Sequence, residues 1–303
     1  MTTTLGRDRA QDRRLAGARR PVPPGQKIRS FGRRLPVRVL LAVLLVIEIY
    51  PFVWLFLGSV KSQSDHLTRS TLSLPTHWMW GNYRTAWVTG QLGTYIRNSL
   101  LVTLPSLVVI VVLGVAAGFA LQVMRWRLRS GVMLLFLAGI MVPSQMILLP
   151  LFTVYYQTGL SGHLWPLPIT YTATGLPLTV FMMATYFRAV PFTLFEAATL
   201  DGASILRCFW SIGLPLVRNA ILTVGLVQFF FIWNDLLIAL TFTNSTNLRT
   251  IQVGLLNFTG MFGSIQYGPL FAAICVNVFG TFLIYLFLNQ RVMRGLASGA
   301  VKG

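Results

Sequence analysis

Residues able to do acid–base, nucleophilic or metal chemistry are scarce in this sequence. Its 303 residues include seven carboxylates, three histidines and two cysteines. The histidines (His66, His77 and His163) are too scattered to predict a metal site, and Cys208 and Cys275 form no CxxC pair. Neither an HExxH nor a GxSxG motif occurs. The sequence therefore predicts no catalytic residues and no metal, and it disfavours an enzyme.

A phosphate-binding loop is missing as well. The lysines of the chain are Lys27, Lys61 and Lys302, and none of them follows a glycine. The GxxxxGK[ST] pattern, whose backbone cradles nucleotide phosphates, therefore cannot form. We expect no cofactor in this chain.

Two carboxylates, Glu48 and Asp235, lie inside long apolar stretches. An acid at the centre of a membrane-spanning helix opposes insertion by roughly 2.5–3.5 kcal/mol, so it is by default a candidate for a functional site. Asp235 directly follows Trp233 and Asn234, which gives a cluster of polar-capable side chains. We consider Glu48, Asn234 and Asp235 candidates for a translocation path. Hydrogen bonds that hold helices together are the competing interpretation.

The elements that would position these acids are membrane helices. The chain is 54% hydrophobic and 11% charged, whereas soluble domains average about 25% charged residues. A helix needs roughly 20 apolar residues to cross a bilayer. Six stretches meet or approach that length, and we interpret the first as an uncleaved helix: Val39–Val60, Leu100–Met124, Val132–Gln157, Leu164–Phe187, Ala220–Thr243 and Leu270–Leu288. The predicted fold is an all-α integral membrane protein with six transmembrane helices.

Basic residues are distributed unevenly between the two sides of this arrangement. An even number of spans places both termini on one side, and that side carries 20 of the 25 Lys and Arg residues, 11 of them in residues 1–38. The positive-inside rule then places both termini in the cytoplasm. This explains the net charge of +18 without a nucleic-acid partner. The basic tail would be attracted to anionic membrane lipid.

A cytoplasmic segment, residues 188–219, is too long for a simple turn. Pro191 suits the first turn of a helix, and an apolar stripe follows at three- and four-residue spacing: Phe192, Phe195 and Thr199. Gly202 permits a sharp turn. Ser204 can cap a second short helix, with an inner face of Ile205, Phe209 and Ile212, before Pro215 opens the rise into the next span. The prediction is a helix–turn–helix bracket beneath the membrane.

The bracket carries a pattern of fixed residues at fixed spacing: Glu196-Ala197-Ala198, Gly202, Ile212 and Leu214-Pro215. This pattern resembles the EAA signature in permease subunits of binding-protein-dependent ABC importers. The sequence is also similar to the carbohydrate branch of this family, and in particular to its maltose-type second permeases. The similarity lies at Asp201-Gly202-Ala203, at Trp233-Asn234-Asp235 and at the end of the chain, residues 295–303. Two positions depart from the pattern: Phe195 stands where an acid often precedes the signature Glu, and Asp235 stands where Glu is frequent. The resemblance covers residues 37–303.

The resemblance implies that the bracket is a coupling helix docked in a cleft of a separate ATPase, which uses the ATP. Glu196 would offer its carboxylate to a basic group there, and Gly202 would form the turn. The implied coupling residues are Glu196, Ala197, Ala198, Asp201, Gly202, Ala203, Leu214 and Pro215. The implied partners are a second, different permease that completes the pore, two ATPase subunits and an extracytoplasmic sugar-binding protein, in a bacterial-type cell membrane.

The outer loop at residues 244–269 contains an aromatic segment flanked by glycines, residues 257–263. It is similar to the segment that such permeases insert into the cleft of the binding protein. The candidate contact residues are Gly260, Met261, Phe262 and Gly263. An ordinary packed loop is the competing interpretation.

The expected organisation is a disordered basic cytoplasmic tail, residues 1–37, followed by a transmembrane permease domain, residues 38–303, which contains the coupling loop. The alternative function is a proton-coupled secondary transporter that uses Glu48 and Asp235 as relays. That alternative leaves the bracket at residues 188–219 without a role.

Overall fold

The computed structural model describes residues 24–260 and 264–300, and these form helices without a β-strand. By length and composition, five helical segments can cross a membrane, or six if one bent pair of helices counts as a single span. This confirms the all-α membrane fold. The first, second, fourth and sixth predicted stretches lie on single helices, which are α2 (Pro24–Ser59), α5 (Leu92–Gln122), α8 (Pro166–Arg188) and α14 (Tyr267–Ala300).

The chain divides into two compact units, residues 1–54 and 55–303. In the first unit, every described side chain from Pro36 to Val53 on α2 is exposed. The predicted disorder of residues 1–37 falls mostly on residues outside the described part of the chain. Helix α2 itself begins at Pro24.

The second unit is organised around the close contact of α5 with α8. Gly114 and Gly118 are one helical turn apart on α5. A Cβ atom at Gly114 would lie 2.3 Å from Thr179 Cγ2, and one at Gly118 would lie 2.7 Å from Met183 Cβ. Small residues at this spacing let two membrane helices approach closely and gain van der Waals contact. Thr179 and Met183 on α8 are fully buried, so this contact is part of the core.

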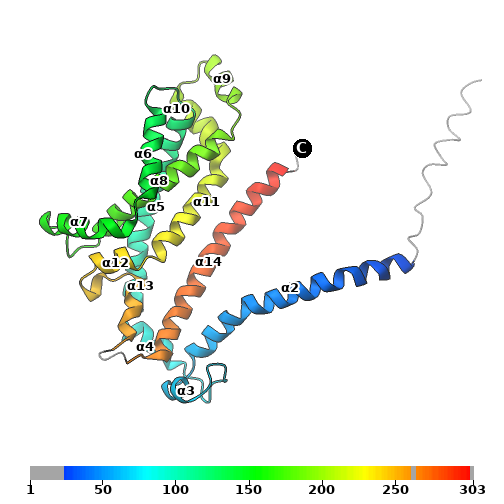
Figure 1. The fold of residues 1–303 in the computed structure, drawn as a ribbon, viewed down its shortest axis with the longest axis vertical. Coiled ribbons are helices and arrows are strands. Elements are labelled where there is room, and N and C mark those ends of the chain that lie inside the picture. Colours follow the sequence, from blue (N-terminus) through cyan, green and yellow to red (C-terminus); the bar gives the residue numbers. More distant parts are fainter. Residues whose placement is uncertain (1–23, 261–263, 301–303) are drawn as a thin grey trace, which may run out of the picture. The chain divides into compact units, whose positions relative to one another are not determined.

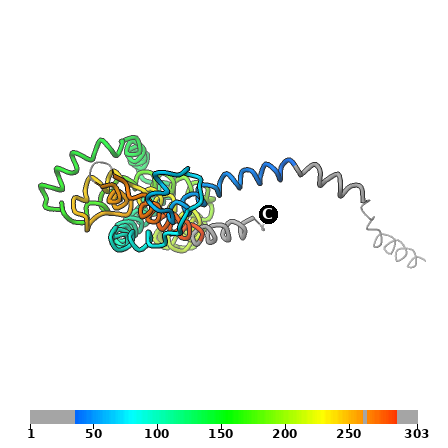
Figure 2. Tube along the Cα trace, turned by 90° about the horizontal axis from the view of Figure 1, so that it is seen from below, coloured from blue at the N-terminus to red at the C-terminus, as the bar shows by residue number. Residues whose placement is uncertain are grey.

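The third predicted span, Val132–Gln157, is not one continuous helix, so the helix predicted there was wrong in shape. It is divided into α6 (Arg129–Met141) and α7 (Ser144–Gln157), which are bent by 94°. Val142 has extended backbone, because a residue before proline is disfavoured in the helical region. Pro143 also lacks the N–H that a continuous helix needs. Helix α7 extends sideways from the longer helices in both views (Figures 1 and 2).

The fifth predicted span, Ala220–Thr243, has different ends from those expected. Helix α11 (Leu214–Trp233) ends at Trp233, and α12 (Leu237–Phe242) is a separate short helix. The Asp235 carboxylate accepts a hydrogen bond from the backbone N–H of Ala239 at 3.0 Å. Short polar side chains compete in this way with a continuing helix. The cluster at Asn234 and Asp235 therefore lies in a break and not in mid-helix.

Short elements lie at the two ends of the second unit (Figure 1). One end carries α9 (Thr193–Leu200) and α10 (Ile205–Cys208). The other end carries α4 (Gly81–Val88), α13 (Ile251–Gly254) and the 3₁₀ turn Leu255–Phe258. Successive connections between the long helices thus lie at opposite ends, as expected for a chain that crosses a membrane several times.

Candidate functional site

The predicted bracket forms a helix, a turn and a second helix. Helix α9 ends at Leu200, and Gly202 has a φ of +81°, a conformation that glycine adopts without steric strain. The backbone N–H of Ala203 donates to the carbonyl of Ala198 at 2.9 Å and closes the turn. The Ser204 hydroxyl then accepts from the Arg207 N–H and caps α10. The helix–turn–helix shape is confirmed.

The second helix of the bracket is not a separate short helix, which corrects the prediction. It continues from α10 through a π-helical turn, Phe209–Gly213, into α11. The Leu214 N–H donates to the carbonyl of Phe209, five residues back, and Pro215 follows without an N–H of its own. The wider turn accommodates this proline, and residues 205–233 form one apolar segment of 29 residues.

The inner face of the bracket also differs from the predicted stripe. Of Phe192, Phe195 and Thr199, only Phe195 is buried. In the second helix Cys208 is buried while Ile205 is exposed. Tertiary packing accounts for this difference. Helices α9 and α10 pack onto the end of α5, and the turn at Gly202 determines which of their residues contact α5. Phe209 and Ile212 are partly buried against the same cluster, as predicted.

The outer face presents most of the signature residues to solvent. Glu196, Ala197, Asp201, Gly202 and Pro215 are exposed, whereas Ala198, Ala203 and Leu214 are half-buried. A Cβ atom at Gly202 would meet nothing within 4 Å. Large apolar side chains lie beside these residues, with Leu200 at 89% and Trp210 at 64% exposure. Exposed apolar side chains that lie together on a surface are typical of sites that contact another protein or a membrane.

Phe119, on α5, is the centre of the packing beneath this surface. Its ring is 5.4 Å from Phe187, 5.9 Å from Phe195 and 5.1 Å from Phe209, each in edge-to-face geometry. These partners belong to α8, α9 and the π-helical turn. A Cβ atom at Gly213 would lie 3.2 Å from the same ring. Phe119 thus joins α9 to α5, α8 and the start of α11 in one aromatic cluster.

The loop between α5 and α6 also contacts the bracket. The Arg125 guanidinium lies 4.8 Å from the centre of the Phe192 ring, a cation–π contact. This contact explains why Phe192 stays at the surface and is not part of the inner stripe.

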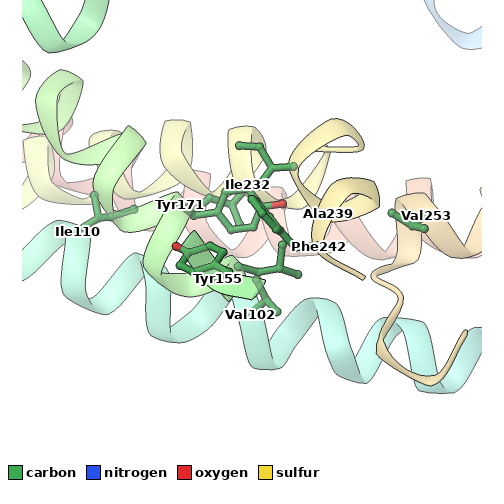
Figure 3. Packing of buried hydrophobic residues seen from close by; sticks show 10 residues of the cluster. Val102, Ile110, Tyr155, Tyr171, Ile232, Ala239, Phe242 and Val253 are labelled. Carbon is green, nitrogen blue, oxygen red and sulfur yellow. The ribbon is translucent and has the colours of Figure 1, made fainter. Parts of the chain in front are cut away.

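A second site lies where the helices break. A half-open cavity of about 540 Å³ is bounded by α6, α7, α8, α11 and α12. Asp235 and Tyr171 line it, and the Tyr171 hydroxyl donates to the Asp235 Oδ2 at 2.7 Å. Figure 3 shows the Tyr171 ring among Ile232, Ala239 and Phe242. Irregular backbone at membrane depth is tolerated where it lines a cavity or is covered by protein.

The other two candidates for the translocation path lie elsewhere. The Asn234 side chain is exposed; it donates to the Phe230 carbonyl and accepts from the Gln252 amide, and it does not line this cavity. Glu48 is an exposed residue of α2 in the first unit. The structure thus brings Asp235 to a cavity, together with residues that sequence reasoning missed, chiefly Tyr171 and Gln145. Pro143, inside an apolar stretch, was the signal that could have located the break.

The candidate contact with a binding protein falls mainly on residues outside the described part of the chain, which are Met261, Phe262 and Gly263. Just before them, the Gly260 N–H donates to the Ser264 carbonyl at 2.6 Å, and Thr259 pairs with Ile265 in an antiparallel bridge. The backbone of Thr259 and Gly260 thus pairs with that of Ser264 and Ile265. The role of Gly260 and its neighbours in contacting a partner stays a prediction.

Comparison with known proteins decides what these elements belong to. Residues 110–294 match the family described as binding-protein-dependent transport system inner membrane component. The chain belongs to this family. It is a multi-pass membrane permease and not an enzyme. The shared family does not support the proton-coupled alternative.

Individual relatives of the permease agree with this assignment. It is 31% identical over 258 residues to the diacetylchitobiose uptake system permease protein NgcG of Streptomyces coelicolor, covering 85% of each chain. It is 33% identical over 263 residues to the trehalose transport system permease protein SugB of Mycobacterium tuberculosis, covering 84% of this chain and 92% of that one. A bacterial ABC transporter chain involved in alginate import has the same fold, with a TM-score of 0.72 at 20% identity over 89% of this chain and 98% of that one.

Proposed function

We propose that this permease is the transmembrane subunit of an ATP-driven sugar importer and forms half of its translocation pore. Relatives such as the diacetylchitobiose and trehalose permeases support a carbohydrate as the cargo. The missing nucleotide-binding loop requires that another subunit uses the ATP. The other partners are a second permease and an extracytoplasmic sugar-binding protein.

The observation that carries this proposal is the exposed surface of α9 and the turn at Gly202, which packs on Phe119 and its three phenylalanine partners. We propose that the ATPase docks there. Glu196 and Asp201 provide carboxylates at the surface, and Leu200 provides apolar area. Closure of the ATPase pair would push α9, and the aromatic contacts of Phe119 would transmit the push to α5, α8 and α11.

Uptake by the reconstituted complex tests this function. The permease would be purified with its partner subunits, placed in vesicles with ATP inside, and supplied with trehalose, diacetylchitobiose or an alginate disaccharide together with the binding protein. We expect ATP-dependent uptake of a neutral sugar and no dependence on a proton gradient. Uptake that follows proton flux without ATP would refute the proposal.

The orientation of the chain is a separate part of the proposal. With both termini in the cytoplasm, Ser130→Cys and Thr199→Cys should be shielded from a membrane-impermeant thiol reagent in intact cells, whereas Thr246→Cys should react. The native Cys208 and Cys275 are buried, so the background should be low. Labelling of Ser130→Cys from outside would contradict the six-span topology.

A further inference from the structure

The cavity at the helix breaks has the size and lining of a small-molecule site. Its volume of about 540 Å³ lies within the range of about 300–1,000 Å³ that such sites occupy. Most of its lining is apolar, and the exposed ring of Phe231 (62% exposed) faces it. Sites of this kind bind apolar parts of a ligand over a broad surface and orient it with a few polar groups.

Polar groups without a protein partner line the same cavity. The Asp235 Oδ2 accepts from Tyr171 and Ala239, whereas its Oδ1 has no hydrogen-bond partner among the described residues. Gln145 and Ser144, at the start of α7, line the cavity, and their side chains likewise form no hydrogen bond within the described part of the chain. A carboxylate oxygen accepts hydrogen bonds, an amide both donates and accepts, and a hydroxyl does both. Together they match the hydroxyl groups of a sugar.

The charge of the lining restricts the ligand further. Asp235 is an acid, and no described residue that lines the cavity is basic. A saccharide carrying a carboxylate would meet a like charge with no cation to offset it, which disfavours binding. A neutral saccharide would instead donate hydroxyl protons to the carboxylate, and hydrogen bonds to an ionised acceptor are the stronger kind.

We propose that this cavity is a subsite for a neutral saccharide, in which Asp235 and Gln145 of this chain bind the sugar hydroxyls. The inference rests on the proposed function and goes beyond it, because it assigns direct sugar contact to this subunit and excludes acidic sugars from the site.

Protection of a cysteine tests the subsite. Gln145→Cys would be made in the full complex, where native Cys208 and Cys275 are buried, and its rate of reaction with a maleimide would be measured with trehalose, diacetylchitobiose or an alginate disaccharide. Thr153→Cys is the matched control, because Thr153 is exposed on the same helix and does not line the cavity. We expect a saturating concentration of a transported neutral sugar, which Asp235 still binds, to slow the reaction of Gln145→Cys several-fold, with no effect of the acidic disaccharide or at the control position.

A second variant separates binding from a change of conformation. Asp235→Asn keeps an acceptor for Tyr171 and Ala239 but places an amide where the free carboxylate oxygen was. In the Gln145→Cys background it should raise the sugar concentration needed for protection about tenfold, the effect expected for one charge-assisted hydrogen bond. Protection that is unchanged by Asp235→Asn would overturn the subsite.

The outcomes distinguish this inference from the function on which it rests. If the unmodified complex takes up the neutral sugar but the sugar gives no protection, the subsite is wrong and the importer stands. If the unmodified complex takes up no neutral sugar, the proposed function is wrong and the subsite falls with it. Equal protection by the acidic disaccharide would also refute the proposed preference for neutral sugars.

Discussion

Helix α11 is irregular at both of its ends, and the two irregular places are built from different side chains. At one end, the π-helical turn Phe209–Gly213 packs against Phe119 and other apolar residues. At the other end, the chain leaves the helix at Asn234, and Asp235 bonds to Tyr171 at the edge of a cavity.

The difference shows what each irregular place can do. An apolar turn in tight contact with its neighbours transmits force, because packed interiors do not deform smoothly. A polar break beside a cavity presents hydrogen-bonding groups to a ligand. The proposed coupling contact and the proposed sugar subsite thus lie at opposite ends of the same helix.

The largest loss of stability should come from removing the Phe119 ring, which is the centre of the packing around the π-helical turn. Phe119→Ala deletes a ring that is 4% exposed and contacts three other phenylalanines. We expect a loss of about 3–5 kcal/mol in unfolding free energy, typical of Phe→Ala in a core, measured by thermal unfolding in detergent. Phe181→Ala, at a ring that is 41% exposed on α8, is the control. Equal loss in both variants would remove the special role of Phe119.

A smaller effect should come from overfilling the contact between α5 and α8. Gly118→Val would push a side chain against Met183 and the backbone of Ala184, and overpacking of this kind costs about 1–3 kcal/mol. Gly225→Val is the matched control, because its Cβ would lie 3.9 Å from the nearest atom, in Val111. The midpoint of thermal unfolding should fall more in Gly118→Val than in Gly225→Val. A larger fall in Gly225→Val would refute the packing argument.

At the polar end, changes should affect stability less. Tyr171→Phe removes the donor to Asp235 and should cost about 1.5 kcal/mol, the lower end of the range for a hydrogen bond to a charged group, because this bond is only partly buried. Asp235→Asn should keep substantial ATP-driven uptake at saturating sugar. Measurements of unfolding and uptake check both. Abolished uptake in Asp235→Asn together with lost proton flux would restore the proton-relay alternative.

The smallest effect on stability is expected at the surface of the bracket. Arg125→Ala removes the cation–π contact with Phe192, which at an exposed site contributes about 0.5–1 kcal/mol. We expect a small decrease in stability, while Arg127→Ala, a neighbour in the same loop, should show none. If Arg125→Ala lowered the unfolding free energy more than Tyr171→Phe does, Arg125 would stabilise the loop by more than this one contact.

Sequence alone predicted most of the long helices and the turn at Gly202, because apolar length and the conformational freedom of glycine are local properties. It did not predict which face of the bracket is buried. The burial of Cys208 in place of Ile205 depends on how α10 meets α5, which no local pattern encodes.

The polar end was predictable only in part. Asp235 is an unusual residue in an apolar stretch and was recognised for that reason. Its partner Tyr171 is 64 residues away in sequence, and only the packed structure brings the two together. The break at Pro143 follows from local backbone chemistry, but the long apolar run around it favoured a continuous helix.

The claim on which this account depends most is that the bracket binds the ATPase. Co-purification of the ATPase with Glu196→Lys and Gly202→Asp permeases tests it most directly. Both variants should insert and express normally: Glu196 is exposed, and at Gly202 only the positive φ is strained, by about 1–2 kcal/mol for a residue with a side chain. Gly131→Asp is the control, because it places the same charge in open space at the start of α6. We predict that both bracket variants lose the ATPase and sugar uptake, Gly202→Asp more completely, while Gly131→Asp keeps them. Full retention of the ATPase and normal uptake in both bracket variants would contradict the account.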